Sequence, residues 1–191
     1  MKVLFIGDIV GRRARNYAQE KIVELKTKLK LDAIIVNVEN SAGGFGVTPS
    51  ICDDFFRVGA DVLTTGNHIW DKREIISYIT KNDRLLRPLN MIEGTPGLGM
   101  TTVDLDAGKI GVANIMTNLF MQKTDNVFDK IPDILENLKL KKNVDFSLVD
   151  IHGEASSEKM ALGNALDGKV TAVVGTHTHV PTADYQILEN G

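Results

Sequence analysis

The feature that most constrains the fold is a regular alternation of short apolar runs with longer amphipathic stretches. Residues 2–7 (KVLFIG), 33–38 (AIIVNV) and 61–66 (DVLTTG) are short and apolar, as in strands that are buried on both faces. A stretch with helical character follows each run, over residues 14–30, 48–59 and 71–82. This order of strands and helices predicts an α/β fold, in which helices pack against a parallel β-sheet.

The second predicted helix has clear signals at both ends. Thr48 is a residue type that caps helix N-termini, and Pro49 suits the first helical position. Gly59 is a typical stop residue. We therefore expect this helix to begin at Pro49 and to stop at Gly59.

The second half of the chain has a different order. Residues 98–105 and 109–116 are adjacent strand-like runs, separated by a short turn, which predicts an antiparallel hairpin. A helix over 125–141, a strand over 145–153, a helix over 155–168 and a strand over 170–179 are predicted to follow.

Composition limits the class of protein. The chain has 191 residues, of which 43% are apolar and 25% charged, as in a soluble globular protein, so we expect a single domain over 1–191. Its net charge of -3 argues against long nucleic acid as a partner. The one cysteine, Cys52, cannot form an intrachain disulfide. No apolar run approaches the roughly 20 residues of a membrane helix, and no signal peptide is evident, so we predict a cytoplasmic protein without a membrane partner.

Polar side chains follow the predicted strands at the points where the strands end. Ligands of open α/β sheets bind just beyond the carboxyl ends of the strands, so these positions are candidates for a site. All four histidines of the chain lie there. In chain order the candidates are Asp8, Glu39, Asn40, Asn67, His68, His152, His177 and His179.

Each of these residues alone has an ordinary structural explanation as a turn, cap or hydrogen-bonded core residue. Together they offer imidazole, carboxylate and amide groups, which suit one or two divalent transition-metal ions. Glu39 is the natural candidate for a carboxylate between two ions, and a histidine left free of metal could protonate a leaving alkoxide. His177 and His179 are expected to alternate on an extended segment, so that both lean to one face. The glycine-rich loop 41–46 is either a surface turn or part of the wall of the site.

Five segments resemble the YmdB-like branch of the calcineurin-like metallophosphoesterases. They are GDIVG, VENSAGGFG, TTGNHIWDK, IHGEASSEK and GTHTHVPTAD, which occur in order over nearly the whole chain. The broader superfamily has Asp-x-His where this chain has Asp8-Ile9-Val10, and Gly-Asp where it has Glu39-Asn40. Both differences are typical of the YmdB-like branch.

The resemblance implies a four-layer α/β/β/α sandwich and a dinuclear centre, commonly of iron or manganese. It implies hydrolysis of small phosphodiesters such as 2′,3′-cyclic nucleotides, through attack of a metal-bound hydroxide in line on phosphorus. Carried over residue by residue, it makes Glu39 a bridging ligand and His68 the proton donor. The implied metal ligands are Asp8, Glu39, Asn40, Asn67, His152, His177 and His179.

The chain also departs from the family pattern. Thr117 and Asn118 stand where the family often has Gly-Arg, and Gly153 stands where alanine is usual. Related chains continue past the last residues, so the sandwich is expected to lack its C-terminal strands and to be C-terminally incomplete. An exposed sheet edge would then favour a homo-oligomer.

Two other functions fit the same residues. One is a metal-binding regulatory or interaction protein of the same fold with little or no turnover. The other is an amidohydrolase-like metal enzyme, which also uses His-x-His, although there the pair follows the first strand and here it follows the last. No substrate-binding residue is assigned from the sequence.

Overall fold

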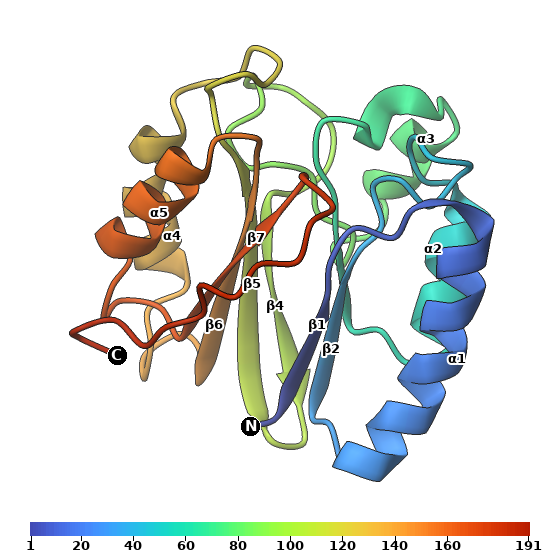
Figure 1. Cartoon of the computed structure of the whole chain (residues 1–191), viewed down its shortest axis with the longest axis horizontal. Helices are drawn as coiled ribbons and strands as arrows, with labels where there is room; N and C mark the ends of the chain where they lie inside the picture. Colours follow the sequence, from blue (N-terminus) through green and yellow to red (C-terminus); the bar gives the residue numbers. More distant parts are fainter.

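Two β-sheets lie face to face at the centre of the structure, a computed structural model that describes residues 1–191 (Figure 1). The first sheet is parallel and has the strand order β1-β2-β3. Its strands are β1 (Val3–Ile6), β2 (Ala33–Asn37) and β3 (Val62–Thr64). The helices that cover its outer face are α1 (Gly11–Leu29), α2 (Pro49–Arg57) and α3 (Ile75–Ile79).

The second sheet has the strand order β4-β5-β6-β7. The predicted hairpin is confirmed, since β4 and β5 are antiparallel, whereas β5, β6 and β7 are parallel. The strands are β4 (Met100–Leu105), β5 (Gly108–Met116), β6 (Phe146–His152) and β7 (Ala172–Thr176). Its outer face is covered by α4 (Ile131–Asn137) and α5 (Ser156–Ala165).

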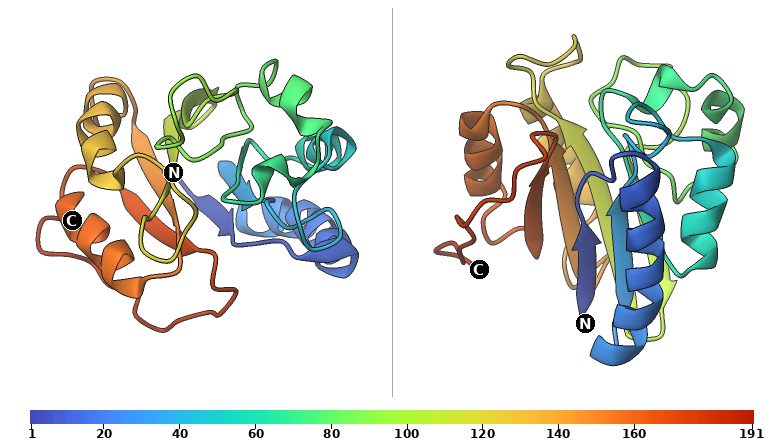
Figure 2. Two further views of the ribbon diagram at one scale, coloured as in Figure 1. Left: turned by 90° about the horizontal axis from the view of Figure 1, so that it is seen from above. Right: turned by 45° about the vertical axis from the view of Figure 1, so that its right-hand side comes forward.

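Side chains alternate between layers along the strands, as the period of two for a β-strand requires. On β2, Ile34 and Val36 pack toward the helices, whereas Ala33 and Ile35 pack between the sheets. On β6, Val149 and Ile151 face the other helix layer in the same way. The molecule is therefore the four-layer α/β/β/α sandwich that the resemblance implied, as the side view also shows (Figure 2).

Local signals explain where α2 begins. The Thr48 side chain accepts a hydrogen bond of 3.3 Å from the backbone N–H of Ile51, as an N-cap residue does. Pro49 occupies the first turn. Gly59 has φ 108°, a left-handed conformation that glycine adopts without strain, and it follows the helix end as predicted.

Two predicted helices are shorter in the structure. The third spans only five residues, because Asp71 belongs to the preceding 3-10 turn, Ile69–Asp71, and the Thr80 hydroxyl just after the helix donates to the Ser77 carbonyl at 3.1 Å. The fourth is divided at Pro132 into a 3-10 turn, Val127–Lys130, and α4. Pro132 lacks the N–H that a continuous helix would donate to the Phe128 carbonyl, and proline is tolerated in the first turn of a helix, where α4 holds it.

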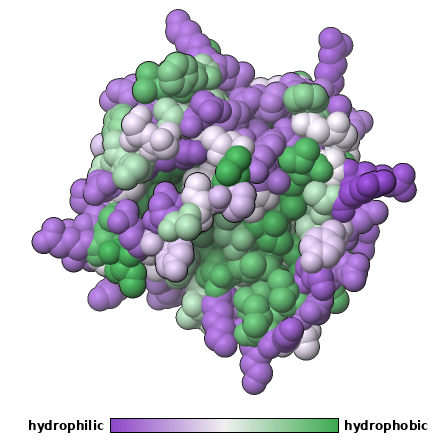
Figure 3. Space-filling view, in the orientation of Figure 1, coloured by the Kyte–Doolittle hydropathy of each residue, from purple (hydrophilic) through white to green (hydrophobic).

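One side of the sandwich is open where β1 and β7 form the outer edges of their sheets. β1 pairs only with β2, and β7 pairs only with β6. Val3 and Phe5 of β1 and Val174 of β7 are only partly buried against the core between the sheets. The space-filling view shows apolar surface in this region (Figure 3). None of the helices is long and apolar enough to cross a membrane.

Candidate metal centre

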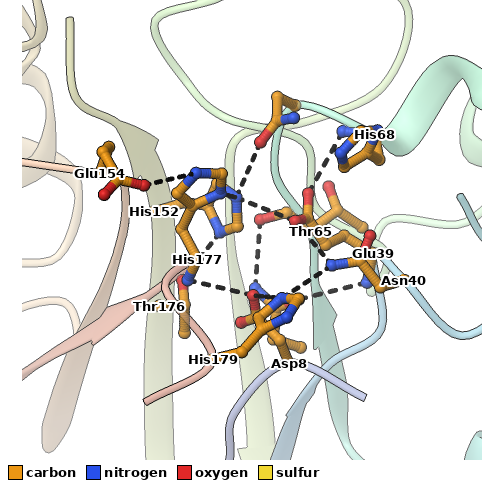
Figure 4. Close-up of polar contacts among 12 residues, drawn as sticks. Asp8, Glu39, Asn40, Thr65, His68, His152, Glu154, Thr176, His177 and His179 are labelled. Carbon is orange, nitrogen blue, oxygen red and sulfur yellow. Dashed lines mark hydrogen bonds and ion pairs between the residues drawn. The ribbon is translucent and has the colours of Figure 1, made fainter. Parts of the chain in front are cut away.

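The candidate site residues from both sheets meet at one end of the sandwich (Figure 4). Asp8 follows β1, Glu39 and Asn40 follow β2, and Asn67 and His68 follow β3. His152 is the last residue of β6, and His177 and His179 follow β7. The backbone N–H of His177 donates to Asp8 Oδ2 at 3.0 Å, which joins segments 169 residues apart. The strand-end argument from the sequence therefore identified side chains that are close in space.

The first group of possible metal ligands consists of Glu39, His152 and His177, whose ligand atoms lie within 4.8 Å of one another. His152 Nε2 lies 3.0 Å from Glu39 Oε1 and 3.1 Å from His177 Nδ1. The Asn67 side-chain oxygen lies 3.0 Å from the same nitrogen. Four potential metal-ligand atoms thus converge on one small volume. A single proton on His152 Nε2 could satisfy only one of its three contacts.

The second group consists of Asp8, Glu39 and His179, again within 4.8 Å. His179 Nε2 lies 3.0 Å from Asp8 Oδ2 and 3.0 Å from the side-chain amide of Asn40. That amide also donates to Glu39 Oε1 at 3.2 Å. Glu39 is the member that the two groups share.

Unpartnered atoms show that these residues fit metal ions. Asp8 Oδ1 and Asn40 Oδ1 are buried and have no hydrogen-bond partner. Glu39 and His152 are fully buried, and a buried polar group without compensation is costly. A Cβ atom at Gly66 would clash with Glu39 Oε2 and with His152 Nε2, so the chain passes these two side chains only with glycine at that position. Imidazole, carboxylate and amide donors are ligands of divalent transition ions.

Electrostatic coupling within the site favours charge on the carboxylate. Burial alone would raise the pKa of the Glu39 carboxyl, but the hydrogen bond and charge of His152 lower the pKa below its usual value. Burial acts to lower the pKa of His152, yet Glu39, Asp8 and Asp150 together raise it. Burial and the neighbouring His152 lower the pKa of His177, which favours the neutral imidazole that coordinates metals.

His68 lies beside the two groups but belongs to neither. Its backbone N–H donates to Glu39 Oε2 at 3.2 Å, which fixes the segment against the site. Its ring Nδ1 lies 2.8 Å from Asp71 Oδ2. Phe45, from the glycine-rich loop, contacts the His68 ring edge to face at 4.9 Å between centroids. The glycine-rich loop 41–46 therefore forms part of the wall of the site. This was one of the two interpretations of the loop from the sequence.

One prediction about the two C-terminal histidines was wrong. They do not alternate on an extended segment, because β7 ends at Thr176 and the backbone then turns. His177 has φ 101° and His179 has φ 57°, both in the region that residues other than glycine seldom adopt. The turn sends His177 to the first group and His179 to the second. Such strained backbone is common at functional sites.

Sequence reasoning missed two acidic residues that contact the site histidines. One is Asp71, whose carboxylate contacts His68. Its spacing of three residues from His68 is the signal in the sequence that could have identified it. Glu154 is the other, with Oε2 3.3 Å from His177 Nε2. Its position two residues after the last residue of β6 was the signal for it.

The Asn118 side chain, where the family often has arginine, stabilises its own loop. It donates to Thr124 Oγ1 at 3.1 Å and to the Asp125 carbonyl at 3.0 Å, and it accepts from the backbone N–H of Val127 at 3.0 Å. These contacts occupy both ends of the side-chain amide.

Comparison with known proteins identifies the family. The sequence profile described as "YmdB-like protein" matches residues 4–191. The chain is 44% identical over 191 residues to the 2′,3′-cyclic-nucleotide 2′-phosphodiesterase of Bacillus subtilis (strain 168), covering 100% of this chain and 72% of that protein.

Two solved structures share both fold and sequence. A protein of Thermus thermophilus has a TM-score of 0.91 and 35% identity, covering 100% of this chain and 73% of that one. A phosphatase of Mycoplasma pneumoniae has a TM-score of 0.88 and 33% identity, covering 100% and 69%. With its α/β/β/α layers and its polar strand ends, the chain belongs to the YmdB-like family of metallophosphoesterases.

Proposed function

We propose that this protein is a metal-dependent phosphodiesterase that hydrolyses small phosphodiesters such as 2′,3′-cyclic nucleotides. The observation that carries the proposal is the pair of ligand groups that share Glu39, beside a histidine that belongs to neither. The activity in the name of the Bacillus subtilis relative supports the same substrate class.

The proposed cofactor is a pair of divalent transition ions, with Glu39 as the shared ligand. Nitrogen and oxygen donors without a thiolate suit iron or manganese. When bound, such ions neutralise charge on phosphate oxygens and make water a better nucleophile near neutral pH. We assign one ion to Glu39, Asn67, His152 and His177, and the other to Asp8, Glu39, Asn40 and His179.

His68 is the proposed proton donor to the ribose oxygen that leaves phosphorus. The Asp71 carboxylate accepts from ring Nδ1, which fixes the ring and leaves Nε2 for the substrate. Phe45 packs against the same ring and restricts its rotation further. This chain thus supplies an oriented acid next to the ligand groups without making that acid a ligand.

The test separates a proton donor from a ligand. With Mn²⁺ added, the protein should hydrolyse 2′,3′-cyclic AMP, and His68→Ala should lower kcat about 10²–10⁴-fold, the usual contribution of general acid catalysis. Elemental analysis should find the metal content of His68→Ala unchanged. The matched variant His177→Ala should lose metal as well as activity, because it removes a proposed ligand.

Two results would contradict this assignment. Loss of metal from His68→Ala equal to that from His177→Ala would make His68 a ligand. Full metal content in the wild-type protein without turnover of any cyclic nucleotide would instead favour a metal-binding regulatory protein of the same fold.

A further inference from the structure

A buried carboxylate lies directly beneath the ligand groups and has no part in the assignments above. Asp150, on β6, is fully buried between the sheets. Its Oδ1 accepts from the Thr176 hydroxyl at 2.7 Å. Its Oδ2 accepts from the Thr64 hydroxyl at 2.5 Å and from the Asn37 side-chain amide at 3.1 Å. Three donors from β2, β3 and β7 therefore stabilise a group that would be costly to bury alone.

The Thr176 hydroxyl connects Asp150 to His152. Its oxygen lies 2.9 Å from His152 Nδ1. A hydroxyl has a single proton, and here that proton is directed to Asp150 Oδ1. The Thr176 oxygen can then only accept from His152, so Nδ1 must carry the imidazole proton. In a neutral ring this leaves the lone pair on Nε2, the atom that faces Glu39, Asn67 and His177 in the site (Figure 4).

The same carboxylate also reaches the other sheet. Asn37, which donates to Asp150 Oδ2, accepts from the backbone N–H of Glu39 at 3.2 Å. Hydrogen bonds therefore connect Asp150 to Glu39 of the first sheet through the Asn37 side chain. They also connect it to His152 of the second sheet through the Thr176 hydroxyl. A small displacement of either sheet would disturb both ligands together.

We propose that Asp150 and Thr176 are positioning residues that hold His152 in the Nδ1–H tautomer and so direct an Nε2 lone pair to the metal ion. The inference rests on the proposed function, because it assumes that His152 is a ligand. Hydrogen-bond partners of metal-ligating histidines orient the ring and fix its tautomer, and their loss typically weakens metal binding about 10–100-fold.

The first experiment measures Mn²⁺ affinity by isothermal titration calorimetry on the chelator-stripped whole chain. Thr176→Val keeps the shape of the side chain but removes the hydroxyl, and should weaken binding about 10–100-fold. Thr176→Ser keeps the hydroxyl and should bind like the wild type. Ser147→Ala is the matched control, because it removes a buried hydroxyl at the far end of the same sheet. It should lose some stability but no affinity.

A second variant tests whether Asp150 acts through Thr176. Asp150→Asn should also weaken Mn²⁺ binding, since an amide has only one oxygen and cannot accept from Thr176 on one side and from Thr64 and Asn37 on the other. Adding it to Thr176→Val should cost less than the sum of the two separate losses, because both changes remove the connection to His152 and only Asp150→Asn also disturbs the one through Asn37 to Glu39. Circular dichroism confirms that each variant is folded.

Several outcomes would overturn the inference. Wild-type affinity in Thr176→Val would do so, as would equal losses in Thr176→Val and Thr176→Ser or in Ser147→Ala. Fully additive losses for the double variant would show that Asp150 acts independently. A wild-type protein that binds no Mn²⁺ would refute the proposed function and the inference with it, whereas tight wild-type binding with an unaffected Thr176→Val would refute the inference alone.

Discussion

At the scale of single residues, two departures from the family pattern, Thr117 and Gly153, lie next to each other. A Cβ atom on Gly153 would clash with Thr117 Oγ1 and lie 2.6 Å from its Cγ2. Thr117 stands where the family often has glycine, and Gly153 where alanine is usual. Thr117 is itself buried, so it cannot move aside. The Thr117 side chain therefore fills the space beside Gly153, between β5 and the segment after β6.

This contact predicts strong coupling between the two positions. Gly153→Ala should lower the free energy of unfolding by about 1–3 kcal/mol, the usual cost of overpacking. The double variant Thr117→Gly/Gly153→Ala should recover most of that loss, because it restores the family arrangement. Urea denaturation of the single and double variants measures the coupling. Additive effects would show that the two side chains do not compete for space.

At the scale of elements, the strands were the most predictable part of the fold. Continuous apolar runs such as 33–38 are buried on both faces, and burial of that kind leaves little choice of structure. The ends of α2 were also predictable, because Thr48, Pro49 and Gly59 each act locally. The third and fourth helices were predicted too long, because hydrophobic periodicity does not show the 3-10 turn before the third helix or the N–H that Pro132 lacks in the fourth.

The site was predictable in composition but not in backbone. The sequence showed which side chains follow strands, and parallel strands bring their ends together, so every member of the two groups was among the predicted site residues. The left-handed turns at His177 and His179 did not follow, because they depend on contacts with Asp8, which is distant in sequence. The hydrogen bonds of Asp150 were not predicted for the same reason, because their donors come from three other strands.

The reactivity of Cys52 reports on how tightly helix α2 packs against the first sheet. Cys52 is the one cysteine of the chain and is fully buried against the first sheet. Burial raises the pKa of its thiol, so the folded protein holds it neutral and shielded. Ellman's reagent should react slowly with native protein and with one thiol per chain after unfolding in urea. Rapid reaction of the native protein would show that α2 separates from the sheet without global unfolding.

At the scale of the whole molecule, the proposed ions would join the two halves of the sandwich. The first group takes Glu39 from one sheet and His152 and His177 from the other, so binding requires both sheets in place. Ligands that bind only the native state stabilise it, by about 2.7 kcal/mol at 100 times Kd. Mn²⁺ should therefore raise Tm, and a chelator should lower it again. His177→Ala is the control and should show a smaller response.

The homo-oligomer expected from the sequence stays a prediction. Light scattering at several concentrations checks it, and a monomer at every concentration would contradict it.

The hydrogen bond between His177 and Asp8 has a consequence for the order of events during synthesis. A ribosome releases Asp8 169 residues before His177. Glu39 and Asp8 are thus released before the imidazoles of His152, His177 and His179, which lie beside them in the folded chain. The proposed centre is complete only after β7 has paired with β6, so capture of the proposed metal ions would follow the pairing of these two strands.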